Sequence, residues 1–245
     1  AKNAIVSSED LALYEAIREL SDIKEHPDST EEQIKQANEK LDKIANNMTV
    51  TSEATLLGRM NWWTADYGLI GTLENPKIYG AGLLSSYGEN KECLKDHVKK
   101  IPLSVNCVDY TYDITEPQPQ LFVAKSFEDL TRVLHELAQS LSYKRGGTYG
   151  LDRAIEAKTV NTVQLNSGLQ VSGKVVDYIA SEDECVYFRL EGPTQLSIGG
   201  NQIPGHDKEY HSHGFSSPVG YVEGFEDCLS WASTEDLESL GIVQG

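Results

Sequence analysis

Residues 59–70 read RMNWWTADYGLI, and this stretch decides how the rest of the chain is interpreted. Two tryptophans, Trp62 and Trp63, precede the carboxylate of Asp66 by about one helical turn of ~3.6 residues. The helix dipole disfavours a carboxylate at a helix C-terminus. Beside buried aromatic rings, a metal, another cation or an arginine would offset that cost. A solvated or salt-bridged aspartate is the simpler interpretation from chemistry alone.

A second informative stretch follows at residues 78–89, which read IYGAGLLSSYGE. The glycines at 80 and 82 do not form a dinucleotide fingerprint, because the third glycine and a long following helix are missing. No GxSxG elbow is present, and neither Ser85 nor Ser86 has a histidine and an acid at an indicative spacing. Acidic residues are plentiful, so a paired-carboxylate hydrolase stays open, although no pair stands out.

The region before these motifs predicts two amphipathic helices. Ser7 with Asp10 and Ser29 with Glu32 have the spacing of capping boxes, and apolar residues recur after each pair at helical intervals. Pro27 ends the first helix. We expect a helical hairpin packed on the body of the protein rather than a partner-binding coiled coil, because the heptad pattern is too short.

The middle of the chain predicts short elements. A third helix is expected from Thr51 or Ser52 through the tryptophans, with Gly68 as its C-terminal cap. Further expected elements are a strand at Lys77–Ala81, a short helix at Glu92–Val98, a strand at Gln120–Ala124, and a helix capped by Ser126 and Asp129 that carries Leu130 to Leu141 and is broken at residues 144–147.

After about residue 158 the pattern becomes β-rich, with Gly, Asn, Ser and Pro between the apolar runs. It predicts a small antiparallel sheet or barrel of roughly fifty to sixty residues. The expected fold class is therefore α+β: a mostly helical part with short strands, followed by a small antiparallel β domain. The expected division is residues 1–150 and 151–245.

Composition narrows the class of protein. The 245 residues carry a formal net charge of −17, so a partner with a phosphate backbone is not expected. No apolar run is long enough to span a bilayer, and no membrane partner is expected. Four widely spaced cysteines form neither a disulfide framework nor a zinc ribbon. We interpret them as reduced thiols of a cytoplasmic protein.

Together the two stretches resemble the second half of the catalytic domain of the pterin-dependent aromatic amino acid hydroxylases. The resemblance runs from about Leu57 to Leu141. It includes the aromatic pair with Thr64, the YGAGLLSS block at 79–86, the Gly88-Glu89 pair and the segment QLFVAKSFED at 120–129. Several separate blocks in the family's order make a chance match implausible.

The resemblance implies an iron and tetrahydropterin enzyme, in which two histidines and one carboxylate hold Fe(II) on one face. Asp66 stands at the position of the carboxylate ligand, where the family usually has glutamate. On the same basis Trp62, Gly82 and Ser85 match positions near the substrate amino acid. Gly58 and Asn61 match pterin-side positions, and Asn61 replaces an aromatic residue of the family.

Two departures from the family pattern bear on this interpretation. Aspartate is one methylene shorter than glutamate, and misplacement of a reacting group by about 1 Å can cost roughly a hundredfold in rate. The family's HxxxxH pair lies upstream of the carboxylate, but His26 is the only histidine before Asp66. We therefore expect the chain to be the C-terminal part of a longer hydroxylase, unable to complete the metal site alone.

Other histidines fall mostly between residues 206 and 213, HDKEYHSH. Alternate residues of a strand share a face, so His211 and His213 could jointly hold a metal. His206 and His211 also have the HxxxxH spacing, but in a β-rich region. A solvated polar loop is the simpler interpretation of this segment. His97 and His135 are expected at the surface or at the edge of the core.

The sequence thus predicts hydroxylation of a small aromatic amino acid, phenylalanine first, with tryptophan and tyrosine open. The alternative is a non-catalytic relative that keeps the amino acid pocket for binding or regulation. Asp66 and the missing histidines favour that alternative. A weaker hypothesis is that the β-rich part is an interaction module that sets a homo-oligomeric state.

Overall fold

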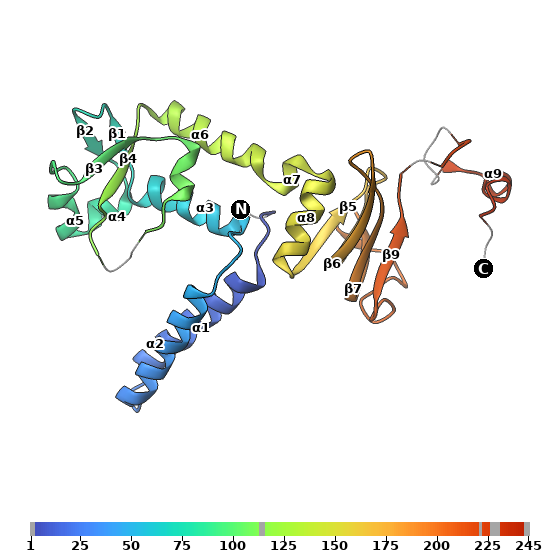
Figure 1. The fold of residues 1–245 in the computed structure, drawn as a ribbon, viewed down its shortest axis with the longest axis horizontal. Coiled ribbons are helices and arrows are strands. Elements are labelled where there is room, and N and C mark those ends of the chain that lie inside the picture. The colour runs from blue at the N-terminus through green and yellow to red at the C-terminus, as the bar shows by residue number, and fades with distance from the viewer. Residues whose placement is uncertain (1–2, 113–115, 221, 226–230, 243–245) are drawn as a thin grey trace. The chain divides into compact units, whose positions relative to one another are not determined.

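The structure is a computed structural model that describes residues 3–112, 116–220, 222–225 and 231–242. The chain divides into two compact units, Ala1–Arg145 (unit 1) and Gly146–Gly245 (unit 2) (Figure 1). Each unit is described by itself. Cys228 lies outside the described residues, and the other three cysteines are free thiols. No helix of the described part of the chain has both the length and the apolar character needed to cross a membrane.

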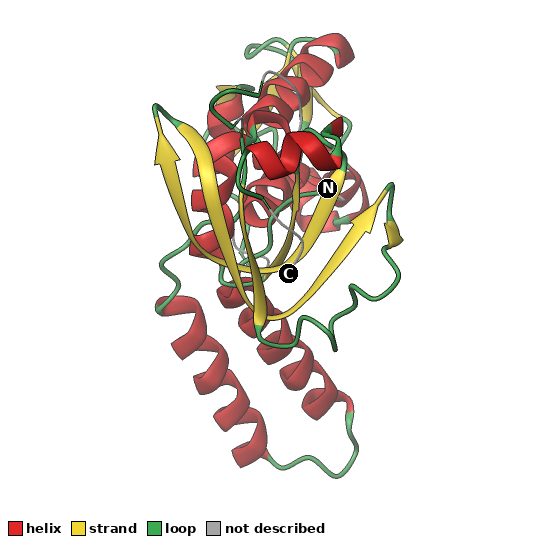
Figure 2. Ribbon diagram, turned by 90° about the vertical axis from the view of Figure 1, so that its right-hand side faces the viewer, coloured by secondary structure: helices red, strands yellow, loops and turns green. Residues whose placement is uncertain are grey.

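The first two helices of unit 1, α1 (Ser8–Glu25) and α2 (Glu31–Asn46), form the expected hairpin and lie side by side in Figure 2. The capping box of Ser7 and Asp10 is confirmed. The second expected box is wrong by one residue, because Thr30 and Gln33 form it instead of Ser29 and Glu32. The N–H of Ser29 donates to the carbonyl of His26, so Ser29 still belongs to the turn that follows α1.

Carboxylates of α1 bind the hairpin to the residues that follow it. Glu9 accepts hydrogen bonds from both the backbone N–H and the hydroxyl of Thr49, at 2.7 and 2.8 Å. Asp10 accepts a hydrogen bond from the hydroxyl of Thr55 at 2.7 Å. Burial raises the pKa of Asp10, but hydrogen bonds from Ser52, Ser7 and Thr55 outweigh burial and leave the pKa below its ordinary value. The start of α1 is therefore held by charge-assisted hydrogen bonds.

The third helix, α3 (Glu53–Asn61), begins at the expected cap, Ser52. The buried carboxylate of Glu53 accepts hydrogen bonds from the N–H groups of Ile5 at 3.0 Å and Ser142 at 2.5 Å. It thereby joins three segments of unit 1. Gly68 is not the C-terminal cap that was expected, because the helical run ends at Asp66 and Tyr67 is its cap. The φ of Gly68 lies outside the left-handed region. A Cβ at Gly68 would lie 2.2 Å from the carbonyl oxygen of Thr64, so close packing is what requires glycine there.

A four-stranded mixed sheet in the order β2-β1-β4-β3 carries the core of unit 1. Its strands are β1 (Leu69–Gly71), β2 (Pro76–Ile78), β3 (Lys99–Pro102) and β4 (Gln120–Ala124), of which β1 and β3 each run parallel to β4. The prediction of β4 is confirmed. The strand expected at Lys77–Ala81 is shorter, because a helix already starts at Ala81. Trp63, Leu83, Leu121 and Phe122 are among the buried core residues.

Three short helices connect these strands: α4 (Ala81–Ser85), α5 (Tyr87–Glu92) and η2 (Val105–Asp109). The helix expected at Glu92–Val98 is wrong, since α5 ends at Glu92 and turns follow. The hydroxyl of Ser86 accepts a hydrogen bond from the N–H of Glu89 and so starts the helix earlier than expected.

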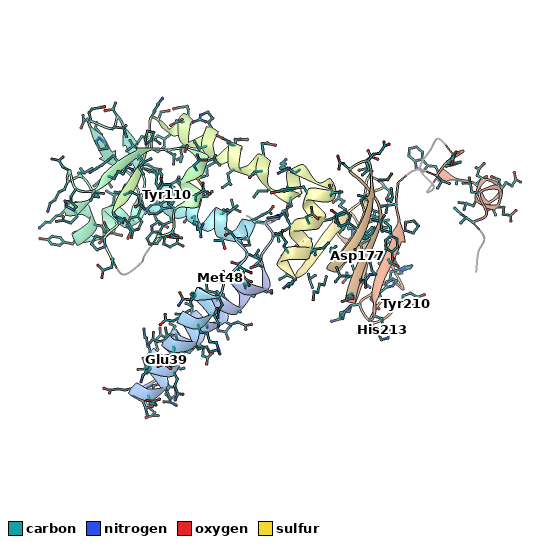
Figure 3. The ribbon with its side chains drawn as sticks, viewed as in Figure 1. Glu39, Met48, Tyr110, Asp177, Tyr210 and His213 are labelled. Atoms are coloured by element: carbon teal, nitrogen blue, oxygen red, sulfur yellow. The ribbon has the colours of Figure 1, made fainter. Side chains whose placement is uncertain are left out.

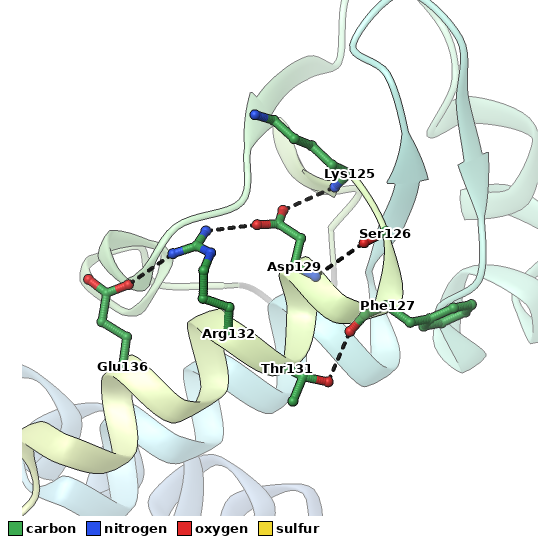
Figure 4. A network of polar contacts seen from close by, with 7 residues as sticks. All are labelled: Lys125, Ser126, Phe127, Asp129, Thr131, Arg132 and Glu136. Carbon is green, nitrogen blue, oxygen red and sulfur yellow. Dashed lines mark hydrogen bonds and ion pairs between the residues drawn. The ribbon is translucent and has the colours of Figure 1, made fainter.

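The next helix, α6 (Phe127–Ser140), has the expected Ser126 cap. Figure 4 shows Asp129 accepting hydrogen bonds from the backbone of Lys125 and from the guanidinium of Arg132, which also pairs with Glu136. α7 (Ser142–Arg145) completes unit 1. The break expected at residues 144–147 is wrong, because α6 already ends at Ser140 and Lys144, Arg145 and Gly147 are helical. α8 (Gly147–Ala157), the first helix of unit 2, was not predicted.

The rest of unit 2 is a sheet whose strand pairs are all antiparallel, as expected. Its strands are β5 (Val160–Gln164), β6 (Leu169–Ser181), β7 (Glu184–Ile198), β8 (Asn201–Gln202) and β9 (Gly214–Pro218), and α9 (Thr234–Ser239) follows them. Val171, Val175, Phe188 and Leu190 are buried in this unit. The α+β fold class is therefore confirmed.

Candidate functional site

The turn that carries Asp66 is a π-helical segment, η1 (Trp62–Asp66), that continues α3. The N–H of Tyr67 donates to the carbonyl of Trp62 at 2.8 Å, five residues back, and this bond closes the wider turn. The hydroxyl of Thr64 donates to the carbonyl of Met60 at 2.6 Å. The expected α-helical spacing between Trp62 and Asp66 is therefore wrong, and such π turns occur frequently at functional sites.

Asp66 is half-buried at the end of this turn. One of its carboxylate oxygens accepts a hydrogen bond from the amide Nδ2 of Asn61 at 3.1 Å. The wide turn brings these two side chains together, since they are five residues apart. Asn61 thus contacts the carboxylate itself, a contact that sequence reasoning did not anticipate.

The indole of Trp62 lies between two tyrosine rings. Tyr67 stacks on one side, with centroids 4.3 Å apart, and Tyr112 stacks at 4.1 Å with an interplanar angle of 6°. The indole Nε1 of Trp62 is buried and has no hydrogen-bond partner among the described residues. Both faces of this indole are therefore covered by tyrosine rings.

Trp63 is a core residue. Its side chain is fully buried, and its Nε1 donates to the carbonyl of Tyr110 at 3.0 Å (Figure 3 labels Tyr110). Its ring meets Phe122 edge-on at 5.3 Å. Of the two tryptophans, only Trp62 is then available for a role in a site.

The glycine turn packs directly on the backbone of the Asp66 turn. The N–H of Gly80 donates to the carbonyl of Gly68 at 3.0 Å. A Cβ on Gly80 would lie 2.4 Å from the carbonyl oxygen of Asp66, and a Cβ on Gly82 would lie 2.8 Å from the ring of Tyr67. The glycines are therefore needed for this close approach, and they fix the position of Asp66 against α4.

The remaining expected site residues lie at the surface. Ser85 is exposed, and its hydroxyl donates to the carbonyl of Gly82 at 3.3 Å. Gly58 is exposed on α3, with open space around the position of a Cβ. Both positions are therefore open to solvent.

Glu89 was part of the resemblance but was not assigned to the site. Burial raises its pKa, although the N–H of Gln118 donates to its carboxylate at 3.3 Å and lowers it. Burial also raises the pKa of Tyr67, and the charges of Glu89 and Asp66 add to that shift. Two acidic groups therefore lie near the Tyr67 phenol. No periodicity signals this pair, because the residues meet only through the packing of the two turns.

The described residues do not form a complete iron site. They contain no group of three or more His, Cys, Asp or Glu side chains that could hold a metal. His26 caps the C-terminus of α1, and its Nδ1 accepts a hydrogen bond from the N–H of Asp28. Asp66 is the right kind of group for a ferrous ion, but it would supply one ligand of three.

The histidine segment at 206–213 is not a strand. Most of its residues lie in turns between β8 and β9, in agreement with the polar loop that was the simpler interpretation. The shared strand face of His211 and His213, which was the alternative, is wrong. His206 and His211 instead approach each other, with Nδ1 and Nε2 3.0 Å apart. His97 and His135 are exposed, within the range that the sequence predicted.

Comparison with known proteins gives one family. A sequence model described as "Biopterin-dependent aromatic amino acid hydroxylase" matches residues 43–171. Phenylalanine-4-hydroxylase of Mus musculus is 40% identical over 88 residues, which are 35% of this chain and 19% of the mouse protein. Protein henna of Drosophila melanogaster is 35% identical over 127 residues, 51% of this chain and 26% of that protein. The chain thus spans about a fifth to a quarter of these relatives.

Two solved structures of phenylalanine hydroxylases are similar to part of the chain. Phenylalanine hydroxylase of Chromobacterium violaceum, with bound iron(III) and 7,8-dihydrobiopterin, is 26% identical; the match covers 44% of this chain and 40% of that one, with a TM-score of 0.31. The Legionella pneumophila phenylalanine hydroxylase is 31% identical over 45% of each chain, with a TM-score of 0.34.

Proposed function

Because the chain belongs to the family of biopterin-dependent aromatic amino acid hydroxylases, we propose that it contributes to the hydroxylation of an aromatic amino acid, phenylalanine to tyrosine. The observation that carries this proposal is the packing of the Asp66 turn against the glycine turn, beside the stacked indole of Trp62. A carboxylate, a flat ring and closely packed backbone come together there.

In this proposal Asp66 is the carboxylate ligand of a ferrous ion. The two imidazole ligands would come from polypeptide outside this chain, which is then the C-terminal part of a longer catalytic domain. Iron and a tetrahydropterin would supply the chemistry that activates dioxygen. Gly82 and Ser85 would face the substrate, and Trp62 would do so once Tyr67 or Tyr112 moves from its indole. Gly58 and Asn61 would lie on the pterin side.

The contact between Asn61 and Asp66 supports a defined orientation of the carboxylate. The amide holds one oxygen, at 3.1 Å, and leaves the other oxygen for a metal. A hydrogen bond from a neighbouring side chain to a metal-binding carboxylate orients that carboxylate toward the metal. The π turn also changes the backbone position from which the Asp66 side chain extends. That position matters because aspartate is one methylene shorter than the glutamate that the family usually has there.

The test uses the protein that carries this chain together with the histidine ligands. Iron content and pterin-dependent formation of tyrosine are measured for the native protein and for Asp66→Ala and Asp66→Glu. We expect Asp66→Ala to lose its iron. Its rate of tyrosine formation should fall at least about a hundredfold, because misplacement of a reacting group by about 1 Å can already cost that much. Asp66→Glu should retain iron. Tyrosine formation at the native rate in Asp66→Ala would remove the assigned role.

The second candidate function is non-catalytic binding of an aromatic amino acid. The single carboxylate and the absence of a metal cluster among the described residues favour it. Saturable phenylalanine binding by a protein that contains no iron and forms no tyrosine would support this alternative.

We further propose that residues 1–150 represent the C-terminal portion of the catalytic domain and residues 151–245 an accessory β-rich module. A cytoplasmic location and a homo-oligomeric state remain predictions. Light scattering on the native protein and on the protein shortened after residue 158 tests the oligomeric state. If both proteins have the same oligomeric state, the module has no role in assembly.

A further inference from the structure

The outer strand of the sheet in unit 2, β5, has one side without a partner strand. β5 pairs with β6 from Val160↔Lys174 to Gln164↔Gln170, and no described strand lies along its other side (Figure 1). The side chain of Val160 is 71% exposed. A strand at the edge of a sheet presents a row of N–H and C=O groups that can pair with another chain.

The turn that joins β5 to β6 shows which backbone groups of β5 are free. The N–H of Leu165 donates to the carbonyl of Leu169 at 2.8 Å, so the backbone groups of Leu165 point toward β6. Hydrogen-bonded and non-hydrogen-bonded pairs alternate along an antiparallel ladder. The N–H and C=O groups of Val160, Thr162 and Gln164 therefore point away from β6, where the described residues offer them no backbone partner.

β5 lacks the features that usually keep edge strands apart. Residues 159–173 contain no charged residue and no proline, although 24% of the chain is charged. The register between β5 and β6 is continuous, without a bulge. The other side of the sheet differs, because β8 has only two residues and β9 ends in Pro218, which has no N–H. Short strands and prolines protect a sheet edge, so β5 is the less protected side.

A second copy of the chain fits this edge when its β5 runs antiparallel to that of the first. With a two-fold axis at Thr162, each Thr162 lies opposite its counterpart, and Val160 lies opposite Gln164 of the second copy. All the outward-pointing residues can then exchange both of their backbone hydrogen bonds. No like charges lie opposite each other, although each copy carries a net charge of −17. The edge is therefore self-complementary, as a two-fold interface requires.

We propose that two copies of the chain pair through β5, so that their sheets form one continuous antiparallel sheet in a symmetric dimer. The inference rests on the homo-oligomeric state given with the proposed function, and it names the surface, the register and the partner. Only five residues pair in each strand. We therefore expect a weak dimer with a dissociation constant in the micromolar range.

Sedimentation equilibrium of the native chain, from low to high micromolar concentration, measures this dimer. Thr162→Lys and Thr162→Glu each place like charges opposite each other at the two-fold axis, so each should weaken the dimer about fivefold or more. These two variants change the net charge in opposite directions, so a loss in both is not an effect of net charge. An equimolar mixture of the two should regain the native affinity, because lysine then lies opposite glutamate.

Two variants serve as controls. Thr162→Val removes the hydroxyl contact with Ser172, at 2.8 Å, but adds no charge, so it should keep the dimer. Ser216→Lys places a charge on an exposed residue of β9, on the other side of the sheet, and should leave the dimer unchanged. Circular dichroism of each variant establishes that it is folded.

The outcomes separate this interface from the oligomeric state itself. A native chain that stays monomeric at all these concentrations would overturn both. An oligomer that Thr162→Lys leaves intact, or that Ser216→Lys dissociates instead, would overturn the pairing through β5 and leave the homo-oligomeric state in place. A mixture of the lysine and glutamate variants that associates no better than either variant alone would overturn the two-fold register at Thr162.

Discussion

At the scale of single residues, the candidate site is built in part from residues that lie far apart in the sequence. Tyr112 stacks on Trp62 from fifty residues further along the chain, and Gly80 packs on the carbonyl of Asp66. The candidate site therefore depends on a few close contacts, each of which can be changed individually.

Gly80→Ala should destabilise the protein. The added Cβ would lie 2.4 Å from the carbonyl oxygen of Asp66 and 2.6 Å from the N of Gly68, and backbone atoms cannot yield as a flexible side chain would. We expect a loss of about 1–3 kcal/mol in the free energy of unfolding, measured with urea. Gly88→Ala is the control, since a Cβ there meets open space. Equal stability of the two variants would contradict this packing.

Tyr112→Ala should expose one face of the Trp62 indole. Loss of the stacked pair is expected to cost about 0.5–1.5 kcal/mol beyond the lost buried area. Acrylamide quenching of tryptophan fluorescence should increase, against the constant background of exposed Trp231 and buried Trp63. If quenching is unchanged, the ring of Tyr112 does not cover the indole in solution.

At the scale of elements, hydrogen bonds to carboxylates fix where helices start and how they are joined. Asp10 connects the capping box of α1 to Thr55 of α3, and Glu53 joins the residues before α1 to α7. The turn after α3 is a π turn rather than a simple end of the helix. Short elements of unit 1 are therefore stabilised by polar contacts as well as by the core.

The stability of unit 1 should depend on pH through Asp10. Its folded-state pKa is lowered, so its contribution is complete above the unfolded pKa of about 3.9 and is lost as the pH falls through the lower folded value. Urea unfolding between about pH 2 and pH 5 should show a shallower pH dependence for Asp10→Asn than for the native chain. Asp22→Asn, at an exposed position of the same helix, is the control. Identical pH profiles for the native chain and Asp10→Asn would exclude this contribution.

At the scale of the whole molecule, the chain has two units with separate buried clusters. The core of unit 1 surrounds Trp63 and Leu83, and unit 2 buries Phe188 and Leu190 of its antiparallel sheet. The two units also differ in sheet type, because only unit 1 contains parallel strand pairs within the described residues.

A core substitution should therefore affect its own unit first. Phe188→Ala removes a fully buried ring and is expected to cost about 3–5 kcal/mol. Hydrogen exchange should accelerate in residues 160–198 and stay unchanged in residues 99–124. Leu83→Ala should give the opposite pattern. Acceleration in both regions in either variant would mean that the two units unfold together.

The sequence alone determined the features that depend on nearby residues. Capping boxes, apolar periodicity and turn residues located α1, α6, β4 and the antiparallel β-rich part, because these are set by hydrogen bonds and burial patterns within a few residues. The order of the motif blocks also pointed to the family, because it can be read directly from the sequence. The sequence also showed that the chain contains no HxxxxH pair before Asp66.

Only the tertiary structure decided which residues meet. Four features have no local signal in the sequence. They are the π turn that joins Asn61 to Asp66, the stacking of Tyr112 on Trp62, the parallel pairing of β1 and β3 with β4, and the close approach of His206 and His211. Each results from packing between segments far apart in the chain or from the path of a turn. Residue propensities and spacing do not specify such contacts. The contacts become favourable in free energy only when the core has formed.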